Sequence, residues 1–272
     1  MGHIYKYEMI RRGKNILIIG GVMLGMTLIS VILSLALHLS AYRQPTPTYA
    51  TIWLSLTMLA IVMIPIVMFF TCCHAHINEL LFKDTNYLML TIPVASWKIL
   101  LGRWLAGLSE YLIYIILSLL CFVCFALSLT ANNVGHVLQT IKSLFINVTG
   151  NTSGLFILLA YFLALFALVG MTIITVNIII RSLIKKRKLT TAISIIVCIF
   201  LFFLLNDFAT WMSEQLNWVS RIKLTGYIYD GTNIISEPIM IPIHMVVPII
   251  WTVLAAAFFF VSSWLLEKKV EV

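Results

Sequence analysis

The sequence predicts an all-α integral membrane protein with six transmembrane helices in a single domain, residues 1–272. Three observations lead to this fold class. The 272-residue chain is 61% apolar and 10% charged, whereas soluble domains are about 45–50% apolar and about 25% charged. Its apolar residues form long runs, and a helix needs about 20 of them to cross a bilayer. These runs do not alternate, which excludes the strand pattern of a membrane barrel.

Six runs are long enough to be transmembrane helices, because lipid offers an irregular backbone no hydrogen-bond partners. The runs are Ile16–Leu39, Ala50–Cys73, Leu105–Leu129, Leu155–Ile180, Leu189–Leu205 and Met245–Leu266. The first begins after a basic stretch and is longer than the signal-peptide core of about 7–15 residues, so we interpret it as a retained helix. The fifth is the shortest of the six.

Lys and Arg predict the topology. Fourteen of them lie in 1–15, 74–104, 181–188 and 267–272, and four (Arg43, Lys142, Arg221 and Lys223) lie in the opposite connections. The richer side is expected to be cytoplasmic, which places both termini inside. We assign the net charge of +8 to topology and to contact with lipid headgroups, not to nucleic acid. The expected location is the plasma membrane of a bacterium.

The first 15 residues predict a short amphipathic helix along the inner interface. Ile4, Tyr7 and Met9–Ile10 recur at near-helical spacing between basic residues, a pattern typical of helices that lie in the membrane plane. A solvated basic tail is the alternative.

The connection between the second and third runs is the most polar inner segment. Asp84 is a candidate helix cap, Pro93 breaks the helical pattern, and Ser96 is a candidate cap for a helix that starts at Trp97. The intervening Tyr87–Leu90 is apolar, so we expect it to meet a protein partner or to be buried against the bundle.

The outer connections carry weaker signals. Two glycosylation patterns begin at Asn147 and Asn151, to which we assign no glycan. The longest outer piece, Asn206–His244, contains Trp211 and Trp218, which suit an interfacial belt or a re-entrant cap. An ordinary surface loop is the alternative.

The stretch Ile92-Pro93-Val94-Ala95-Ser96-Trp97-Lys98-Ile99-Leu100-Leu101-Gly102-Arg103 resembles the loop after the second span in permeases of type-2 ATP-binding-cassette exporters. In that family a Leu-Pro-Val-Ser-type segment precedes Ile-Leu-Leu-Gly-Lys. The extra Ala95 and the Arg103 are departures. The predicted layout, with an amphipathic start, six spans and both ends inside, extends the resemblance along the chain.

The resemblance implies a cytoplasmic coupling helix that seats in a groove of a separate ATPase subunit. Its residues would be Phe82, Lys83, Asp84, Thr85, Asn86, Tyr87, Leu88, Met89 and Leu90. Asp84, Tyr87 and Leu88 would make the main contacts, and residues 1–14 would form a connecting helix nearby. The alternative is that Phe82–Leu90 is only the first turns of a membrane helix.

The resemblance also implies the partners. Two ATPase copies would bind ATP and Mg²⁺, a second copy of this chain would complete the pathway, and the cargo would be amphipathic. Compact six-span members of the family serve peptide export or antimicrobial-peptide immunity, the exporters of phenol-soluble-modulin toxins among them. Lipid, drug and sodium export are the rival cargoes.

The residues themselves predict no enzyme. The phosphate-binding pattern G-x-x-x-x-G-K-[ST] is absent, and no paired catalytic groups for a membrane enzyme are found. Energy must therefore come from another polypeptide or, as the alternative, from an ion gradient that drives a carrier without an ATPase.

Glu110 is the only carboxylate inside the six runs, so it is a candidate for the cargo pathway. The alternative is a carboxylate near the inner interface that bonds Arg103 or a neighbouring helix.

Two further patterns have open interpretations. Gly21 and Gly25 form a G-x-x-x-G, and Ala160, Ala164 and Ala167 form a small-residue stripe. Either could mark internal helix packing or the seam of a dimer.

No metal site is predicted. The five cysteines all fall in apolar runs and are expected to be free thiols. Cys121 and Cys124 lack the second pair that zinc needs. His74, His76 and Glu79 are interpreted as interfacial polar residues.

Overall fold

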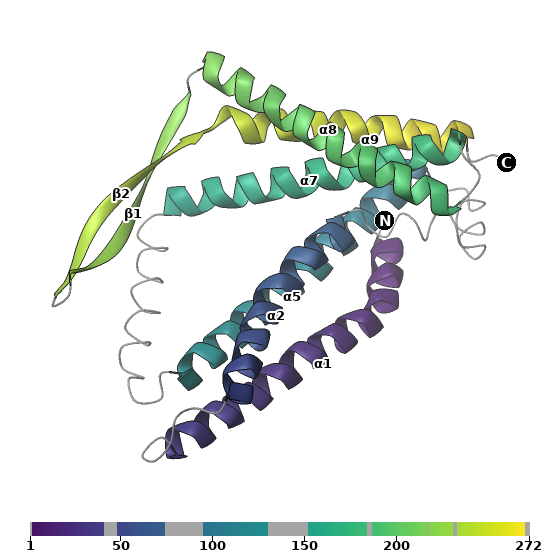
Figure 1. The fold of residues 1–272 in the computed structure, drawn as a ribbon. Helices are drawn as coiled ribbons and strands as arrows, with labels where there is room; N and C mark the ends of the chain where they lie inside the picture. The colour runs from purple at the N-terminus through teal and green to yellow at the C-terminus, as the bar shows by residue number, and fades with distance from the viewer. Residues whose placement is uncertain are drawn as a thin grey trace. The chain divides into compact units, whose positions relative to one another are not determined.

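The computed structural model describes residues 2–40, 48–73, 95–129, 152–183, 187–216, 218–230 and 233–269. These residues are nearly all helical, and six helices among them are long and apolar enough to cross a membrane (Figure 1). The elements are α1 (Gly2–Ser40), α2 (Thr48–Cys73), α5 (Ser96–Leu129), α7 (Thr152–Leu183), α8 (Arg187–Leu216), β1 (Val219–Asp230), β2 (Asn233–His244) and α9 (Val246–Lys269). The six predicted transmembrane helices are therefore confirmed by length and composition.

The chain divides into two compact units. Met1–Leu80 and Tyr87–Gln139 form the first, and Leu81–Asn86 and Thr140–Val272 form the second. Among the described elements, α1, α2 and α5 belong to the first unit, whereas α7, α8, both strands and α9 belong to the second. That the two units together form one six-helix domain stays a prediction.

The basic segment at the start of the chain is not a separate helix. It forms the first turns of α1, which is continuous over 39 residues, and these turns run at an angle to the rest of the helix (Figure 1). At 1.5 Å per residue α1 is about 58 Å long, about twice the hydrocarbon thickness of about 30 Å. Its first turns expose Lys6, Tyr7, Ile10 and Lys14, a mixture that suits the membrane interface.

The fifth helix is longer than its apolar run predicted. We expected Leu189–Leu205, but α8 continues to Leu216. Leu205, Ala209 and Ser213 are all buried, and their spacing of four residues puts them on one helix face. The helical period thus continues where the charges of Asp207 and Glu214 end the apolar run.

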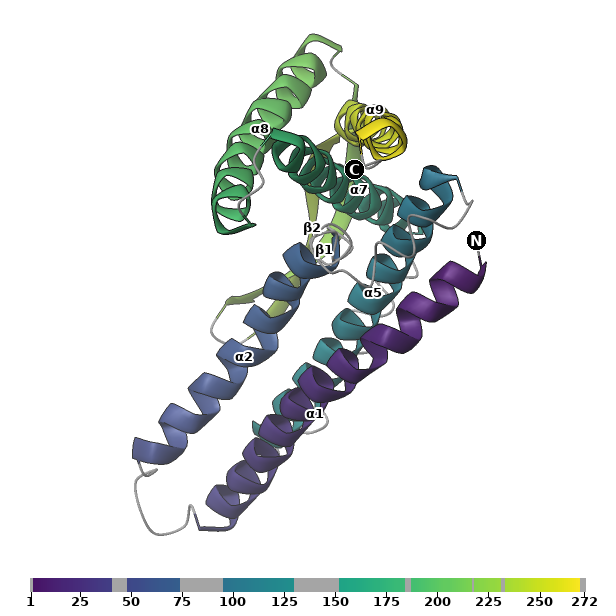
Figure 2. The ribbon, with the colours of Figure 1, turned by 90° about the vertical axis from the view of Figure 1, so that its right-hand side faces the viewer.

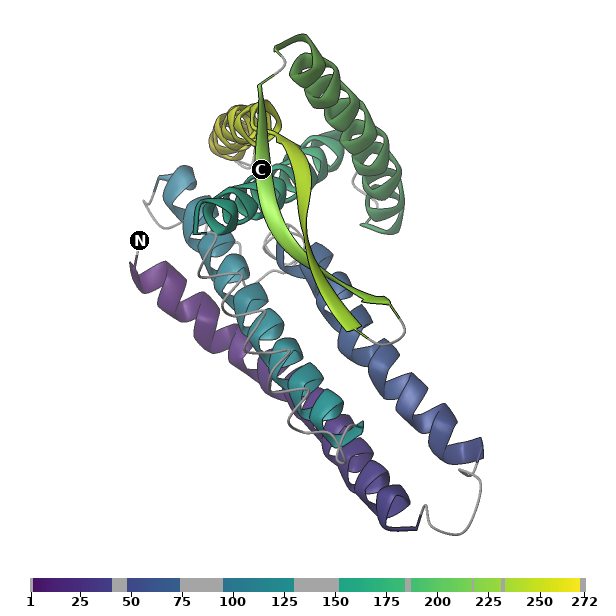
Figure 3. The same cartoon turned by 90° about the vertical axis from the view of Figure 1, so that its left-hand side faces the viewer.

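The all-α prediction is wrong for the segment after α8. Val219–Asp230 and Asn233–His244 form a two-stranded antiparallel sheet, so the segment is not a plain loop, and its place as an interfacial belt or a re-entrant cap stays a prediction. Figure 3 shows the two strands twisted around each other, as two-stranded ribbons normally are.

The register of this hairpin explains how two prolines fit in β2. Met245 N donates to Trp218 O over 3.1 Å, so the next pair, Val219 and His244, belongs to the non-hydrogen-bonded class. Because the classes alternate, Pro242 opposite Arg221 and Pro238 opposite Thr225 are also in that class. Their nitrogens, which carry no hydrogen, therefore point away from β1, so neither proline removes a hydrogen bond between the strands.

In the first unit α5 packs against both α1 and α2 (Figure 2). Their shared apolar core consists of Met23, Ile61, Cys121 and Phe125. Ser30 Oγ and Thr57 Oγ1 are 2.7 Å apart and join α1 to α2, and Ser118 Oγ donates to Ile61 O over 2.7 Å. Polar contacts of this kind stabilise helix association in lipid, where apolar contact alone gives little preference.

In the second unit α7 packs against α8 and α9. The core residues are Ala164, Leu168, Leu205, Ala209 and Trp251. Thr175 Oγ1 and Ser262 Oγ are 2.7 Å apart across α7 and α9. Tyr161 Oη donates to the carbonyl oxygen of His244, so the end of β2 is fastened to α7.

The small-residue stripe on α7 contributes partly to this core. Ala164 is buried in it, whereas Ala167 is half-buried and Ala160 is exposed. Ala164 thus marks packing inside the second unit.

Candidate functional site

One face of the first turns of α1 packs on the first turns of α5. A Cβ built at Gly102 would lie 3.2 Å from Cγ2 of Ile4, so the two backbones approach closely there. Tyr5 Oη donates to Ser109 Oγ over 2.9 Å, and Ser109 Oγ in turn donates to Leu105 O over 2.9 Å. The residues that follow at helical spacing on the same face of α1 are Glu8 and Arg12.

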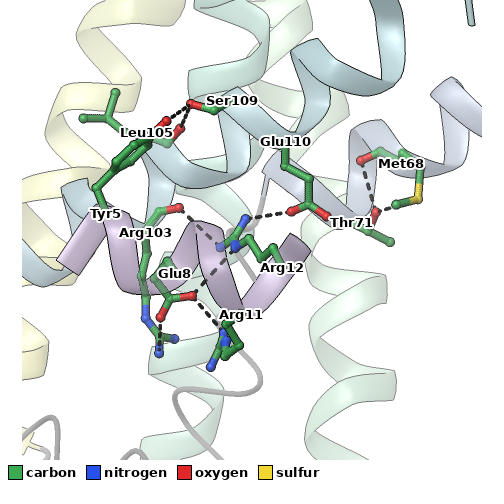
Figure 4. Close-up of polar contacts among 10 residues, drawn as sticks. All are labelled: Tyr5, Glu8, Arg11, Arg12, Met68, Thr71, Arg103, Leu105, Ser109 and Glu110. Carbon is green, nitrogen blue, oxygen red and sulfur yellow. Dashed lines mark hydrogen bonds and ion pairs between the residues drawn. The ribbon is translucent and has the colours of Figure 1, made fainter. Parts of the chain in front are cut away.

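Four side chains between these segments form a row of alternating charge, which we call the buried charge chain (Figure 4). Arg103 Nη2 lies 3.0 Å from Glu8 Oε1, and Glu8 Oε2 lies 3.7 Å from Arg12 Nε. Arg12 Nη1 then donates to Glu110 Oε2 over 2.9 Å. The order Arg103, Glu8, Arg12, Glu110 therefore crosses from α5 to α1 and back to α5.

All four members are removed from solvent. The exposed fraction is 1% for Arg103, 0% for Glu8, 2% for Arg12 and 0% for Glu110. Arg11, with 27% exposed, adds a contact of 2.9 Å from Nη2 to Glu8 Oε2. A charge inside a membrane helix is expensive unless it is paired, and here each carboxylate lies against at least one guanidinium.

The remaining helix of this unit, α2, also packs against the site. A Cβ at Gly107 would clash with the carbonyl oxygen of Cys72 on α2 and would lie 3.3 Å from Arg12 Nη1. Only glycine allows α2 and α5 to come so close here. Buried Cys72 and Tyr114 lie next to Glu110, so α1, α2 and α5 meet around its carboxylate.

The structure places Glu110 in contact with a neighbouring helix, which was one of the two interpretations left open. It pairs with Arg12 of α1, and Arg103 pairs with Glu8 of the same helix. A role of Glu110 in the cargo pathway stays a prediction.

The sequence interpretation missed Glu8 and Arg12. Glu8 is the only acidic residue before Glu79, and it stands four residues before Arg12. An acid and a base at this spacing lie on the same helix face. That isolated acidic residue in a basic segment was the signal that could have identified the pair.

Glu110 is also not the only acidic residue within a membrane-length helix. Asp207 and Glu214 lie in α8, where both are exposed, because the helix continues past its predicted end. Glu8 lies in the same continuous helix as the first span.

Gly21 and Gly25 do not mark a close contact in the described part of the chain. A Cβ at either position would meet nothing within 4 Å, whereas a Cβ at the adjacent Gly20 would lie 3.1 Å from Leu117. The interpretation of Gly21 and Gly25 as a dimer seam stays a prediction.

Several predicted residues lie outside the described residues. They are the coupling segment Phe82–Leu90, the polar residues His74, His76 and Glu79, the break at Pro93, and the sequons at Asn147 and Asn151. The helix expected to start at Trp97 begins at Ser96.

The cysteines lie in α2, α5 and α8 as free thiols. Cys72, Cys73 and Cys121 are buried, Cys198 is half-buried and Cys124 is exposed. Within the ranges that the structure describes, no three His, Cys, Asp or Glu side chains come together as a metal site would need.

No family model, no curated protein and no solved structure matches this chain.

Proposed function

We propose that this chain is the membrane subunit of an ATP-driven exporter whose ATPase is a separate polypeptide. The proposal begins from the resemblance of Ile92–Arg103 to permeases of type-2 ATP-binding-cassette exporters, and six membrane-length helices agree with that layout. The observation that best supports the proposal is the ion pair between Glu8 and Arg103. It joins the N-terminal basic segment to the end of the very motif that carries the resemblance.

In this proposal the ATPase acts from the cytoplasm on Phe82–Leu90. Both termini lie on the same side, as the distribution of Lys and Arg predicts. ATP and Mg²⁺ bind to the ATPase alone. Closure of two ATPase copies displaces the coupling segment and tilts the spans, a rigid-body gating step, in two copies of this chain related by a two-fold axis.

The contacts of the first unit support this use of the N-terminal segment. Residues 4–12 of α1 are fixed to residues 102–110 of α5 by one close backbone approach, one hydroxyl contact and the buried charge chain. A segment held this firmly follows its neighbour. In the proposal it therefore takes part in the response to the ATPase.

The cargo we propose is an amphipathic peptide, such as an antimicrobial or toxin peptide. The resemblance to compact peptide exporters supports this choice. A lipid, a drug or an ion would leave the same coupling machinery in place.

Co-purification tests the proposal. The tagged chain is isolated from its own membranes in a mild detergent, and bound polypeptides are identified by mass spectrometry. We expect an ATPase with a G-x-x-x-x-G-K-[ST] pattern, whose turnover rises when this chain is present. Tyr87→Ala with Leu88→Ala should release it, whereas Cys124→Ser, at an exposed position of α5, should not.

Two results would contradict the proposal. One is a preparation of the intact chain with no ATPase bound. The other is transport that continues after ATP is depleted and stops when the ion gradient is collapsed, which would identify a gradient-driven carrier.

A further inference from the structure

The contacts between α1 and α5 are distributed along both segments. Ile4 meets Gly102, Glu8 binds Arg103, Tyr5 binds Ser109, and Arg12 binds Glu110. Arg12 Nη2 also donates to the carbonyl oxygen of Arg103 over 3.4 Å. These contacts cover residues 4–12 on one helix and 102–110 on the other, about two turns of each.

The chemistry of these contacts opposes any sliding of one segment along the other. Sliding by one helical turn would take Glu8 away from Arg103 and Arg12 away from Glu110 while all four remain buried. A buried charge that loses its partner is strongly destabilising. We therefore expect only two arrangements, in which the two segments are either fully joined or fully apart.

The position of this junction in the chain suits a mechanical role. α5 begins at Ser96, directly after the connection that contains Phe82–Leu90, and Arg103 lies in its second turn. A force on the connection reaches this part of α5 first. Through Glu8 and Arg12 it then reaches the first turns of α1, which continue without a break into the first span.

We propose that Glu8 and Arg12 are positioning residues that make the first turns of α1 and α5 move as one rigid body when the ATPase works. This inference rests on the proposed function and extends it, because it names the residues that carry the displacement to the first span. It predicts that fixing the junction does no harm and that breaking its charges uncouples the ATPase.

A disulfide tests the first half. The Cβ of Ile4 lies 3.5 Å from a Cβ built at Gly102, within the range of about 3.5–4.5 Å found in disulfides. The double variant Ile4→Cys/Gly102→Cys should form the bond on oxidation, as peptide mass spectrometry would detect. Turnover of the co-purified ATPase should be the same before and after reduction. Loss of turnover that a reductant reverses would overturn the inference.

Removal of charge tests the second half. Glu8→Gln keeps the shape and should lower the stimulation of the ATPase by about fivefold or more, the ordinary size of coupling between sites, with the amount of bound ATPase unchanged. Glu8→Asp keeps the charge and should retain most of the stimulation. Lys14→Gln, at an exposed position of the same segment, is the matched control and should behave as the parent.

A second variant covers the case in which Glu8→Gln fails to insert. Glu8→Met/Arg103→Met replaces the pair by apolar side chains and leaves no new buried charge at position 103, a replacement that folds well in other proteins. It should assemble, bind the ATPase and fail to stimulate it. Full stimulation in this variant would overturn the inference while the proposed function stands. Absence of any ATPase from the parent chain would overturn both.

Discussion

At the scale of single residues, the first unit contains four charged side chains that are buried in the protein. Glu8, Arg12, Arg103 and Glu110 are all buried and are arranged so that opposite signs are adjacent. A lone ionised group in this position would lose its solvation without compensation. The cost is offset only because the four are placed together, so each depends on its neighbours.

Glu110→Gln should therefore destabilise the first unit. Arg12 would lose its 2.9 Å ion pair with Glu110, and breaking a buried pair costs about 3–5 kcal/mol. We expect a lower thermal midpoint in detergent, measured by size-exclusion chromatography after heating.

Glu110→Met/Arg12→Met is the matched control, since it removes both charges and should recover much of the midpoint. An unchanged midpoint for Glu110→Gln would contradict this role. Unchanged transport with normal assembly would remove Glu110 from the cargo pathway.

Gly107→Ala should also be destabilising, by about 1–3 kcal/mol, the usual cost of overpacking. The new methyl group would clash with the backbone of Cys72 and crowd Arg12. Gly21→Ala is the control on α1, because a Cβ there meets nothing within 4 Å. Thermal midpoints of the two variants side by side check the prediction, and equal midpoints would refute it.

Part of this site could be predicted from the sequence. Glu110 was identified because a carboxylate in an apolar run is conspicuous on its own. Glu8 and Arg12 were missed because their neighbours are charged too, so that hydropathy alone does not distinguish them from a solvated segment. Their burial depends on contact with α5, which follows from the packing of helices far apart in sequence.

At the scale of elements, hydropathy located six helices and misjudged two boundaries. The end of α8 was placed too early because two charges, Asp207 and Glu214, interrupt the apolar run, although Ala209 and Ser213 keep the helical period. The start of α1 was separated from its span for the same reason. In both cases the charges lie on a helix that continues, because a backbone near a membrane gains from staying hydrogen-bonded.

The hairpin was missed although the sequence contains its signals. Ile222, Leu224 and Thr225 belong to a stretch in which apolar and polar residues alternate. The two residues between the paired Asp230 and Asn233 are Gly231-Thr232, and Gly in the first position of a two-residue connection is a hairpin signal. The aromatic residues of the same segment suggested a membrane belt instead. Interfacial and strand preferences of Tyr and Trp coincide, so composition could not separate the two.

A pair of proline substitutions tests the register. Leu224 pairs with Ile239 and Thr225 with Pro238, so the alternation of classes gives Leu224 the inward N–H and Thr225 the outward one. Leu224→Pro should remove a ladder bond worth about 1 kcal/mol and speed hydrogen exchange in β2 about fivefold.

Thr225→Pro should leave the exchange rates of β2 near those of the parent, since no inter-strand bond is lost. Mass spectrometry of hairpin peptides measures both variants. The reverse order of effects would show that the register is shifted by one residue.

At the scale of the whole molecule, the proposed function depends on which side of the membrane the basic connections face. The predicted topology places fourteen of the eighteen Lys and Arg on the side of Phe82–Leu90. ATP is available to a partner only in the cytoplasm. An ATPase can therefore reach this segment only if the positive side is the inner one, as the rule for membrane proteins predicts.

The most direct measurement is the labelling of a single new cysteine in the coupling segment. Thr85→Cys is treated with a membrane-impermeant maleimide in intact cells and in permeabilised cells, with the parent chain as the background. We predict labelling above background only after permeabilisation. Equal labelling in intact cells would place Phe82–Leu90 outside, beyond the reach of any ATPase, and would contradict the account.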